Sequence, residues 1–314
     1  MSRLGHAGAR LVCAATLVLL AAGALVVGTG SSLAVPDWPL AYGQVFPPMV
    51  GGILFEHGHR LIAAAVGVLT VALAVWMARV EPRRWVRWLG FGAVGAVVLQ
   101  GLLGGITVLL LLPKSVSISH ALLAQNFFLL AVLIAQFTSS AWPGLVQTSG
   151  SAQGASLRWL AGVTLVFAEI EILLGALVRH YNAGLIIPDF PLALGQVVPP
   201  LDSFPVAIHY VHRVAALALL LLILATGWAS LRHPSGDGPL KRRAAALVVL
   251  VLLQVALGAA IIWTQRSLAV TTLHVVNGAL VLAAAGLVAL RAGMLEIPAP
   301  ATTSAFRRPN PARR

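Results

Sequence analysis

Long runs of apolar residues alternate with short polar segments along almost the whole chain. A helix needs about 20 consecutive apolar residues to cross the hydrocarbon core of a bilayer. Runs of this kind lie near residues 11–28, 60–78, 88–112, 116–137, 158–178, 207–230, 242–264 and 268–290. The pattern therefore predicts an all-α, polytopic membrane protein with eight transmembrane helices.

The polar segment after the first apolar run occurs twice. PDWPLAYGQVFPP at residues 36–48 returns as PDFPLALGQVVPP at residues 188–200, with ten of thirteen positions identical. The pair His59-Arg60 returns as His212-Arg213, and single histidines stand at 120 and 274. The offset is 152 residues for the loop and 154 for the last histidines, so the chain contains two copies of a four-helix unit.

Each copy has an even number of spans, so the two copies are expected to be parallel, with a pseudo-twofold axis along the membrane normal. This predicts two four-helix bundles. We expect an N-terminal half at 1–137, a Ser-, Gly- and Gln-rich linker at 138–157, a C-terminal half at 158–291 and a basic tail at 292–314. The first span also resembles a signal peptide, but its partnership with the fifth span favours a retained helix.

Composition and charge support the membrane interpretation. Hydrophobic residues make up 59% of the 314 residues and charged residues only 10%, and the formal net charge is +12. Sixteen basic residues fall on one side of the predicted membrane and three on the other, which places both termini in the cytoplasm and both repeated loops outside. The basic residues are thus explained by topology and contact with lipid, and we expect no nucleic-acid partner.

Cysteine chemistry is almost excluded. Cys13 is the only cysteine in the chain and lies within the first span. An internal disulfide, a cysteine metal cluster and a covalent CxxCH haem attachment are therefore impossible.

Two matched pairs of histidines are the main candidates for ligands. His59 and His120 lie in the outer parts of spans two and four, and His212 and His274 repeat them. Two imidazoles at one depth on facing helices suit the axial ligation of a haem iron. A single histidine is often hydrogen-bonded between helices instead, and zinc normally takes further protein ligands. Two matched pairs favour two haem sites.

The copies differ beside the first ligand of each pair. Glu56 precedes His59 by three residues, whereas His209 occupies the matching position before His212. A carboxylate near a haem can relay protons or stabilise a developing cation, so we expect chemistry in the first half and electron storage in the second. The alternative for Glu56 is an acid favoured by the helix macrodipole.

Several other charged residues lie near the predicted sites. Arg60, Arg213 and Arg179 are candidate contacts for haem propionates, although snorkelling explains the first two almost as well. Glu169 and Glu171 lie inside the fifth span, where ionisable residues are costly. Because they are two residues apart, their side chains point in different directions, and no single role inferred from the sequence requires both of them.

The stretches EHGHR at 56–60 and IHYVHR at 208–213, the histidines at 120 and 274 and the two PD(W/F)PLA loops resemble the haem A synthase family. The resemblance covers about residues 11–290. It implies a membrane-bound, haem-dependent oxidoreductase that oxidises the C8 methyl of haem O to the formyl of haem A by successive O2-dependent hydroxylations. The product is destined for terminal oxidases.

The resemblance also implies roles for residues and partners. His212 and His274 would hold a haem b cofactor, His59 and His120 the substrate haem O, and Glu56 would be the catalytic carboxylate. We expect a protein of the bacterial cytoplasmic membrane that works with an electron donor and with the enzyme that produces haem O; homo-oligomer formation is left open. Some family members carry a cysteine pair in the outer loops, where this chain has Val35 and Ala41.

Two other functions use the same features. A non-enzymatic membrane cytochrome b with two bis-histidine haems needs the same four histidines, but it gives no reason for Glu56 in one half only. A transporter built on an internal repeat would accommodate Glu169 and Glu171. The histidines cluster toward one face, whereas transporter sites lie near the midplane.

Overall fold

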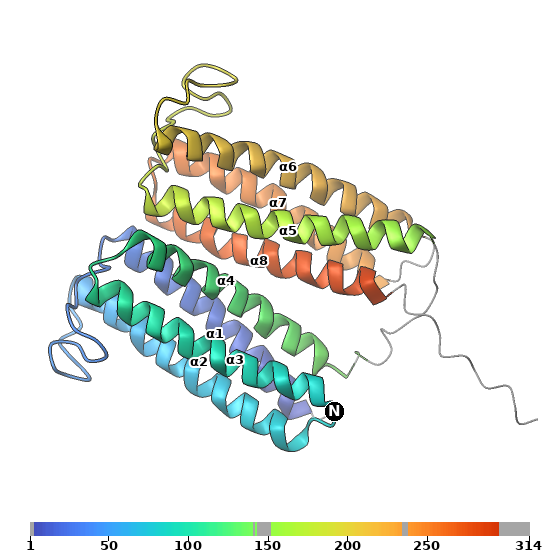
Figure 1. Ribbon diagram of the computed structural model, residues 1–314, viewed down its shortest axis with the longest axis horizontal. Helices are drawn as coiled ribbons and strands as arrows, with labels where there is room; N and C mark the ends of the chain where they lie inside the picture. The colour runs from blue at the N-terminus through green and yellow to red at the C-terminus, as the bar shows by residue number, and fades with distance from the viewer. Residues whose placement is uncertain (1–2, 141, 143–151, 234–237, 295–314) are drawn as a thin grey trace, which may run out of the picture.

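The computed structural model describes residues 3–140, 142, 152–233 and 238–294. These residues form eight long α-helices, all long and apolar enough to span a membrane, which confirms the predicted fold class (Figure 1). The helices are α1 (Arg3–Gly28), α2 (Gly52–Val80), α3 (Arg84–Leu109), α4 (Lys114–Phe137), α5 (Ala152–His180), α6 (Phe204–Arg232), α7 (Gly238–Trp263) and α8 (Leu268–Met294).

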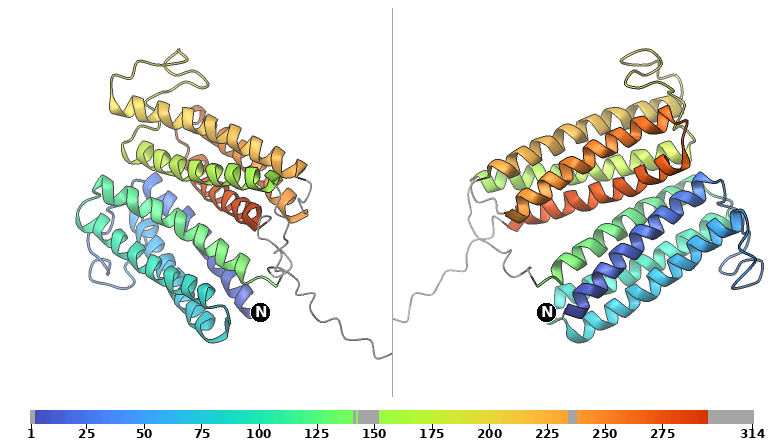
Figure 2. Two further views of the ribbon diagram at one scale, coloured as in Figure 1. Left: turned by 45° about the vertical axis from the view of Figure 1, so that its right-hand side comes forward. Right: turned by 180° about the vertical axis from the view of Figure 1, so that it is seen from behind.

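The helices form two rings of four, which we call the first half (α1–α4) and the second half (α5–α8). In the first half, α1 and α3 each pack against both α2 and α4, so α2 and α4 occupy opposite corners. In the second half, α6 and α8 occupy opposite corners in the same way. The two predicted four-helix bundles are therefore confirmed, and they stand side by side in every view (Figures 1 and 2).

The two halves meet mainly through α8. This helix packs on α1 and α4 as well as on its own neighbours α5 and α7, and α4 also packs on α5. α8 has protein on most sides, and its later part is apolar and rich in small residues, as in the stretch VLAAAGLVAL at 281–290. Small side chains let neighbouring backbones approach closely within a bilayer.

The repeat extends to the conformation of the backbone. Both repeated loops contain a cis peptide bond before a proline, Trp38-Pro39 in one and Phe190-Pro191 in the other. Matched positions with positive φ are Tyr42 and Leu194 (52° and 53°), Gly43 and Gly195 (71° and 74°), and Leu111 and Gln265 (58° and 49°). The duplicated sequence therefore adopts a duplicated loop shape.

The predicted division of the chain is tested only in part by the described residues. Much of the expected linker, 138–157, lies outside them, and α5 already begins at Ala152. Most of the expected tail, 292–314, also lies outside them, since α8 ends at Met294. The boundaries of the two halves at 1–137 and 158–291 stay predictions.

Candidate functional site

The four matched histidines lie near one end of the molecule. We call this the loop end, because the first loop (residues 29–51) and the second loop (residues 181–203) both emerge there (Figure 1). Each histidine follows the first residue of its helix by six to eight positions, which is about 9 to 12 Å along the helix axis. The four histidines are His59 on α2, His120 on α4, His212 on α6 and His274 on α8.

Each pair of histidines is carried by helices at opposite corners of its half. His59 and His120 are close enough to interact electrostatically. His274 interacts with His212 in the same way. The two histidines of each half therefore lie within electrostatic range of one another; that each pair holds one haem iron stays a prediction.

A glycine on a neighbouring helix lies beside each imidazole. A Cβ atom added at Gly23 would lie 3.1 Å from Cε1 of His59, and one at Gly104 would lie 3.2 Å from Cε1 of His120. In the second half, Gly175 and Gly258 stand in the same relation to His212 and His274, at 3.4 Å each. A Cβ at residue 23 or 104 would require its imidazole to shift by a few tenths of an ångström, whereas one at 175 or 258 would meet the ring in ordinary van der Waals contact.

The histidine nitrogens fit the axial ligands of a haem. All four Nδ1 atoms are buried without a hydrogen-bond partner, although each side chain is only half-buried. The accessible part of each ring therefore excludes Nδ1. Nε2 is the nitrogen that iron would take in the prediction; for His120 and His274 it lies 3.4 and 3.2 Å from the amide nitrogen of Gln100 and Gln254. Among the described residues no cluster of three or more His, Cys, Asp or Glu is poised for a metal ion. Two nitrogens suffice where a porphyrin supplies the remaining donors.

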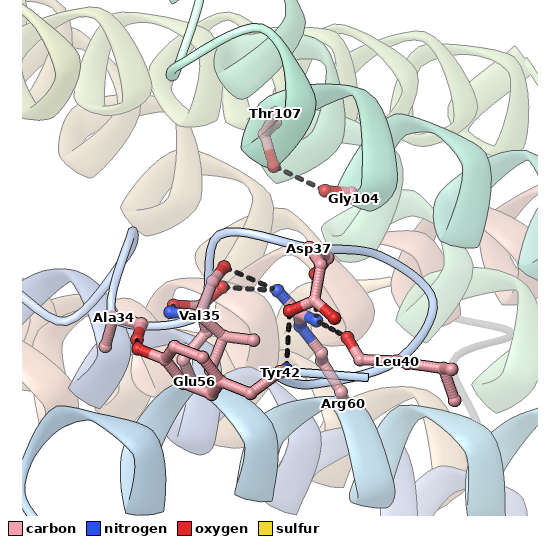
Figure 3. A network of polar contacts seen from close by, with 9 residues as sticks. All are labelled: Ala34, Val35, Asp37, Leu40, Tyr42, Glu56, Arg60, Gly104 and Thr107. Atoms are coloured by element: carbon pink, nitrogen blue, oxygen red, sulfur yellow. Dashed lines mark hydrogen bonds and ion pairs between the residues drawn. The ribbon is translucent and has the colours of Figure 1, made fainter. Parts of the chain in front are cut away.

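Glu56 is held at the junction of the first loop and α2 (Figure 3). Its Oε2 accepts a hydrogen bond of 2.8 Å from the Val35 backbone N–H, and its Oε1 lies 2.7 Å from a guanidinium nitrogen of Arg60. The residue is only 4% exposed. The carboxylate thus lies one helical turn from His59, and its position is coupled to that of the loop.

Arg60 and Arg213 clamp the two loops. The guanidinium of Arg60 donates to the backbone carbonyls of Val35, Asp37 and Leu40 (Figure 3). Arg213 makes the same three contacts with the carbonyls of Ile187, Asp189 and Leu192. Sequence reasoning missed this role, although the constant offset between each loop and its His-Arg pair was a signal for it. Their contact with haem propionates stays a prediction.

Arg179 connects the two halves. Its guanidinium donates a 2.9 Å hydrogen bond to the backbone carbonyl of Ala24 on α1. This contact places it beside Gly23, the glycine that packs on His59. A propionate contact for Arg179 likewise stays a prediction.

The two loops also reach across the loop end of the bundle. Trp38 of the first loop lies over Gly105 of α3, where an added Cβ would be 2.7 Å from the indole ring. Phe190 of the second loop packs edge-on against Trp263 of α7, with ring centroids 6.1 Å apart. Each loop therefore extends from the base of α2 or α6 toward the third helix of its half.

We expect Arg60→Met to open the first loop selectively. This change removes the donor to three loop carbonyls, two of them part-buried and one exposed, and methionine cannot replace it. Limited proteolysis with chymotrypsin should then cut faster after Tyr42. The matched control, Arg213→Met, should open the second loop and leave the first intact; equal cutting of both loops in either variant would contradict the assignment.

An aspartate closes the turn inside each loop. The backbone N–H groups of Gly43 and Tyr42 donate to the carboxylate of Asp37 at 2.8 and 2.7 Å, and these bonds hold its pKa below the ordinary value of 3.8. Asp189 has a lowered pKa for the same reason, with Gly195 and Leu194 as donors. Such turns stabilise the ionised carboxylate.

The lowered pKa of Asp37 predicts how the first loop responds to acid. Because the pKa is lower in the folded state, the stabilisation is complete above the unfolded pKa and is lost as the pH falls through the folded pKa. Protection of the peptide 36–48 from hydrogen exchange should therefore persist above pH 3.8 and decline below it. Asp37→Asn should lack this decline, and an unchanged pH profile in that variant would refute the prediction.

Comparison with known proteins gives a consistent result. Residues 50–285 match a family described as cytochrome oxidase assembly protein, COX15-CtaA. The chain is 35% identical over 228 residues to a protein of Symbiobacterium thermophilum named heme A synthase, covering 71% of this chain and 74% of that protein. It is similar to proteins of the same name from Alkalihalophilus pseudofirmus (32%) and Halalkalibacterium halodurans (34%), covering 82% of this chain and 87% of each relative.

Proposed function

Because the chain belongs to the COX15-CtaA family of cytochrome oxidase assembly proteins, we propose that it oxidises the C8 methyl group of haem O to the formyl group of haem A. Relatives named heme A synthase imply that it is an enzyme. The observation that supports the specific reaction is Glu56, one helical turn before His59, because the matching position before His212 is occupied by His209 and not by an acid. An electron-carrying cytochrome would need no such asymmetry.

The two histidine pairs take different roles in this proposal. His59 and His120 hold the substrate haem O, and His212 and His274 hold a haem b cofactor. A haem b at the second site supplies one-electron redox chemistry when it is bound. The glycines beside the imidazoles leave room for all four rings, which is consistent with this proposal.

Glu56 is the proton-transferring residue of the proposed reaction. Each hydroxylation of the methyl group consumes O2, two electrons and two protons and releases water, and the resulting gem-diol loses water to give the formyl group. Proton movements of this kind need a titratable group near the reacting carbon. The Val35 N–H and the Arg60 guanidinium position both oxygens of Glu56.

The proposed cellular setting follows from family membership and charge. The chain is a membrane protein with bacterial relatives, and we place it in the bacterial cytoplasmic membrane with both termini in the cytoplasm. Basic residues gather at the helix ends away from the loop end, for example Arg10, Arg79, Arg83 and Arg232. Its partners are then the lipid bilayer, an electron donor and the enzyme that supplies haem O.

The decisive test is the mass of haem extracted from cells that express the full chain together with a source of haem O. A formyl-bearing haem that appears only when the chain is present supports haem A synthesis. Unmodified haem O, with a purified protein that carries two low-spin haems b, would overturn the proposal and indicate an electron-transfer cytochrome. A purified protein without haem would instead favour the alternative that the chain is a transporter.

A further inference from the structure

Glu171 on α5 lies in direct contact with one of the four matched histidines. Its Oε1 is 2.9 Å from Nδ1 of His212 on α6. The contact is at hydrogen-bond distance, although Nδ1 has no hydrogen bond of good geometry in the structure. Glu171 stands one helical turn before Gly175, the glycine that packs on the same imidazole. One face of α5 therefore both admits the ring and presents a carboxylate to it.

The first half lacks this carboxylate. At the offset of 152 residues that relates Gly175 to Gly23, Glu171 corresponds to Leu19 on α1. The polar group of α1 that acts on His59 is the backbone carbonyl of Leu19. The matched histidines His59 and His212 therefore differ by one acidic side chain next to Nδ1.

The glutamine beside the opposite ligand has hydrogen bonds to more residues in the second half than its counterpart in the first. Nε2 of Gln254 lies 3.2 Å from Nε2 of His274, and the Gln254 carbonyl accepts a 2.8 Å hydrogen bond from Asn277. In the first half, the carbonyl of Gln100 is buried without a partner. The residue that corresponds to Asn277 is Leu123, which cannot donate. Asn277 thus fixes the amide of Gln254, whereas the amide of Gln100 contacts His120 at Nε2 and at its backbone carbonyl (3.4 and 3.0 Å) without such support.

We propose that Glu171 is a positioning residue that orients His212 and lowers the reduction potential of the second-half haem. The inference rests on the proposed assignment of His212 as an iron ligand. A carboxylate that accepts the Nδ1 proton fixes the ring tautomer and makes the ligating nitrogen more basic. A more basic ligand with a negative charge nearby stabilises ferric over ferrous iron.

This arrangement gives the two sites different potentials, with the second half the lower. The difference favours the movement of one electron from the second-half site to the first-half site. Such a transfer would oxidise a haem iron held by His212 and His274 from ferrous to ferric and reduce one held by His59 and His120 from ferric to ferrous. Glu171 thereby suits the second half to donate electrons and the first half to receive them.

The test uses the full chain purified from cells that lack haem O, so that the resident haem is observed. The variants are Glu171→Gln, Glu171→Leu and Glu171→Asp. Glu169→Gln is the matched control, because Glu169 lies on the same helix but its carboxylate contacts Asn126 on α4. The readouts are the midpoint potential, from an optical redox titration, and the electron paramagnetic resonance spectrum of the low-spin ferric haem.

Glu171→Gln and Glu171→Leu should raise the ratio of ferrous to ferric haem at a fixed potential roughly tenfold, a positive shift of about 59 mV for a one-electron couple. Glu169→Gln should leave it unchanged. A haem-loaded Glu171→Gln variant with the wild-type midpoint and spectrum overturns the inference. If Glu171→Gln loses haem, the Glu171→Asp variant is decisive. Bound haem with the wild-type midpoint potential in Glu171→Asp supports the positioning role. Loss of haem in Glu171→Asp as well overturns it.

The outcomes for this inference and for the proposed reaction are separable. A wild-type chain that makes haem A and has a midpoint independent of Glu171 refutes the positioning role alone. A chain whose resident haem responds to Glu171 but which makes no haem A refutes the reaction alone. A wild-type chain that purifies without haem refutes both.

Discussion

Glu56→Gln is expected to retain both histidine sites and to lower haem A production by roughly 100-fold or more, the usual scale for loss of a general acid or base. Glutamine has nearly the same shape, and its carbonyl oxygen can still accept one of the two bonds that Val35 and Arg60 donate. The loop and the neighbouring ligand His59 should therefore stay in place. Only the capacity to take up and release a proton is removed.

The measurement compares the mass of extracted haem with the haem content of the purified protein. His209→Gln is the matched control, since His209 occupies the corresponding position before His212 and contacts Arg213 through its Nε2 atom at 3.3 Å. This variant should retain most of the activity. Full haem A production by Glu56→Gln would remove the catalytic assignment of Glu56 while leaving the two haem sites in place.

His212→Ala is expected to remove the resident haem, reducing the haem bound per chain at least roughly tenfold. Changes in groups that merely support a ligand already cost about 10- to 100-fold in metal affinity, so the loss of an axial ligand should cost no less. His59→Ala should keep the resident haem and lose the substrate site. The two variants should therefore have different effects on the resident haem. If both halves shared one haem site, or if the sites were assigned wrongly, this difference would not be seen.

The measurement is haem per chain in protein purified from cells without haem O. His57→Ala provides the control for a nearby buried imidazole, because Nε2 of His57 bonds the backbone carbonyl of Val45 at 2.8 Å and takes no part in a pair. Equal haem loss in His59→Ala and His212→Ala, or equal loss in His57→Ala, would contradict the division of roles.

Much of this arrangement could be predicted from sequence because it depends on patterns that persist over many residues. Eight apolar runs and an offset of 152 to 154 residues are enough to predict the helices and the two bundles, whereas the pairing of His59 with His120 on one iron stays a prediction. Glycines at matched offsets, such as Gly23 and Gly175, carried a usable signal for the contacts with the imidazoles, but small residues occur throughout these helices.

The contacts of single polar side chains were harder to predict. The partners of Arg60 are backbone carbonyls of a loop, and a carbonyl has no signature in the sequence. A guanidinium near an expected haem was therefore interpreted as a propionate contact. To predict the contact of Glu171 with His212, one must know which face of α5 is turned toward α6. Helix periodicity does not reveal that face, because both helices are apolar on nearly all sides.

The contacts between the halves have the symmetry of an isologous dimer. Exchanging the halves turns the packing of α1 on α8 into that of α5 on α4, and it turns the packing of α4 on α8 into itself. Two identical four-helix subunits would associate through such a surface. Identical subunits would necessarily carry identical residues at both sites. Joining them in one chain allows Glu56 to belong to one site and Glu171 to the other, so covalent fusion permits a division of labour that a homodimer could not have.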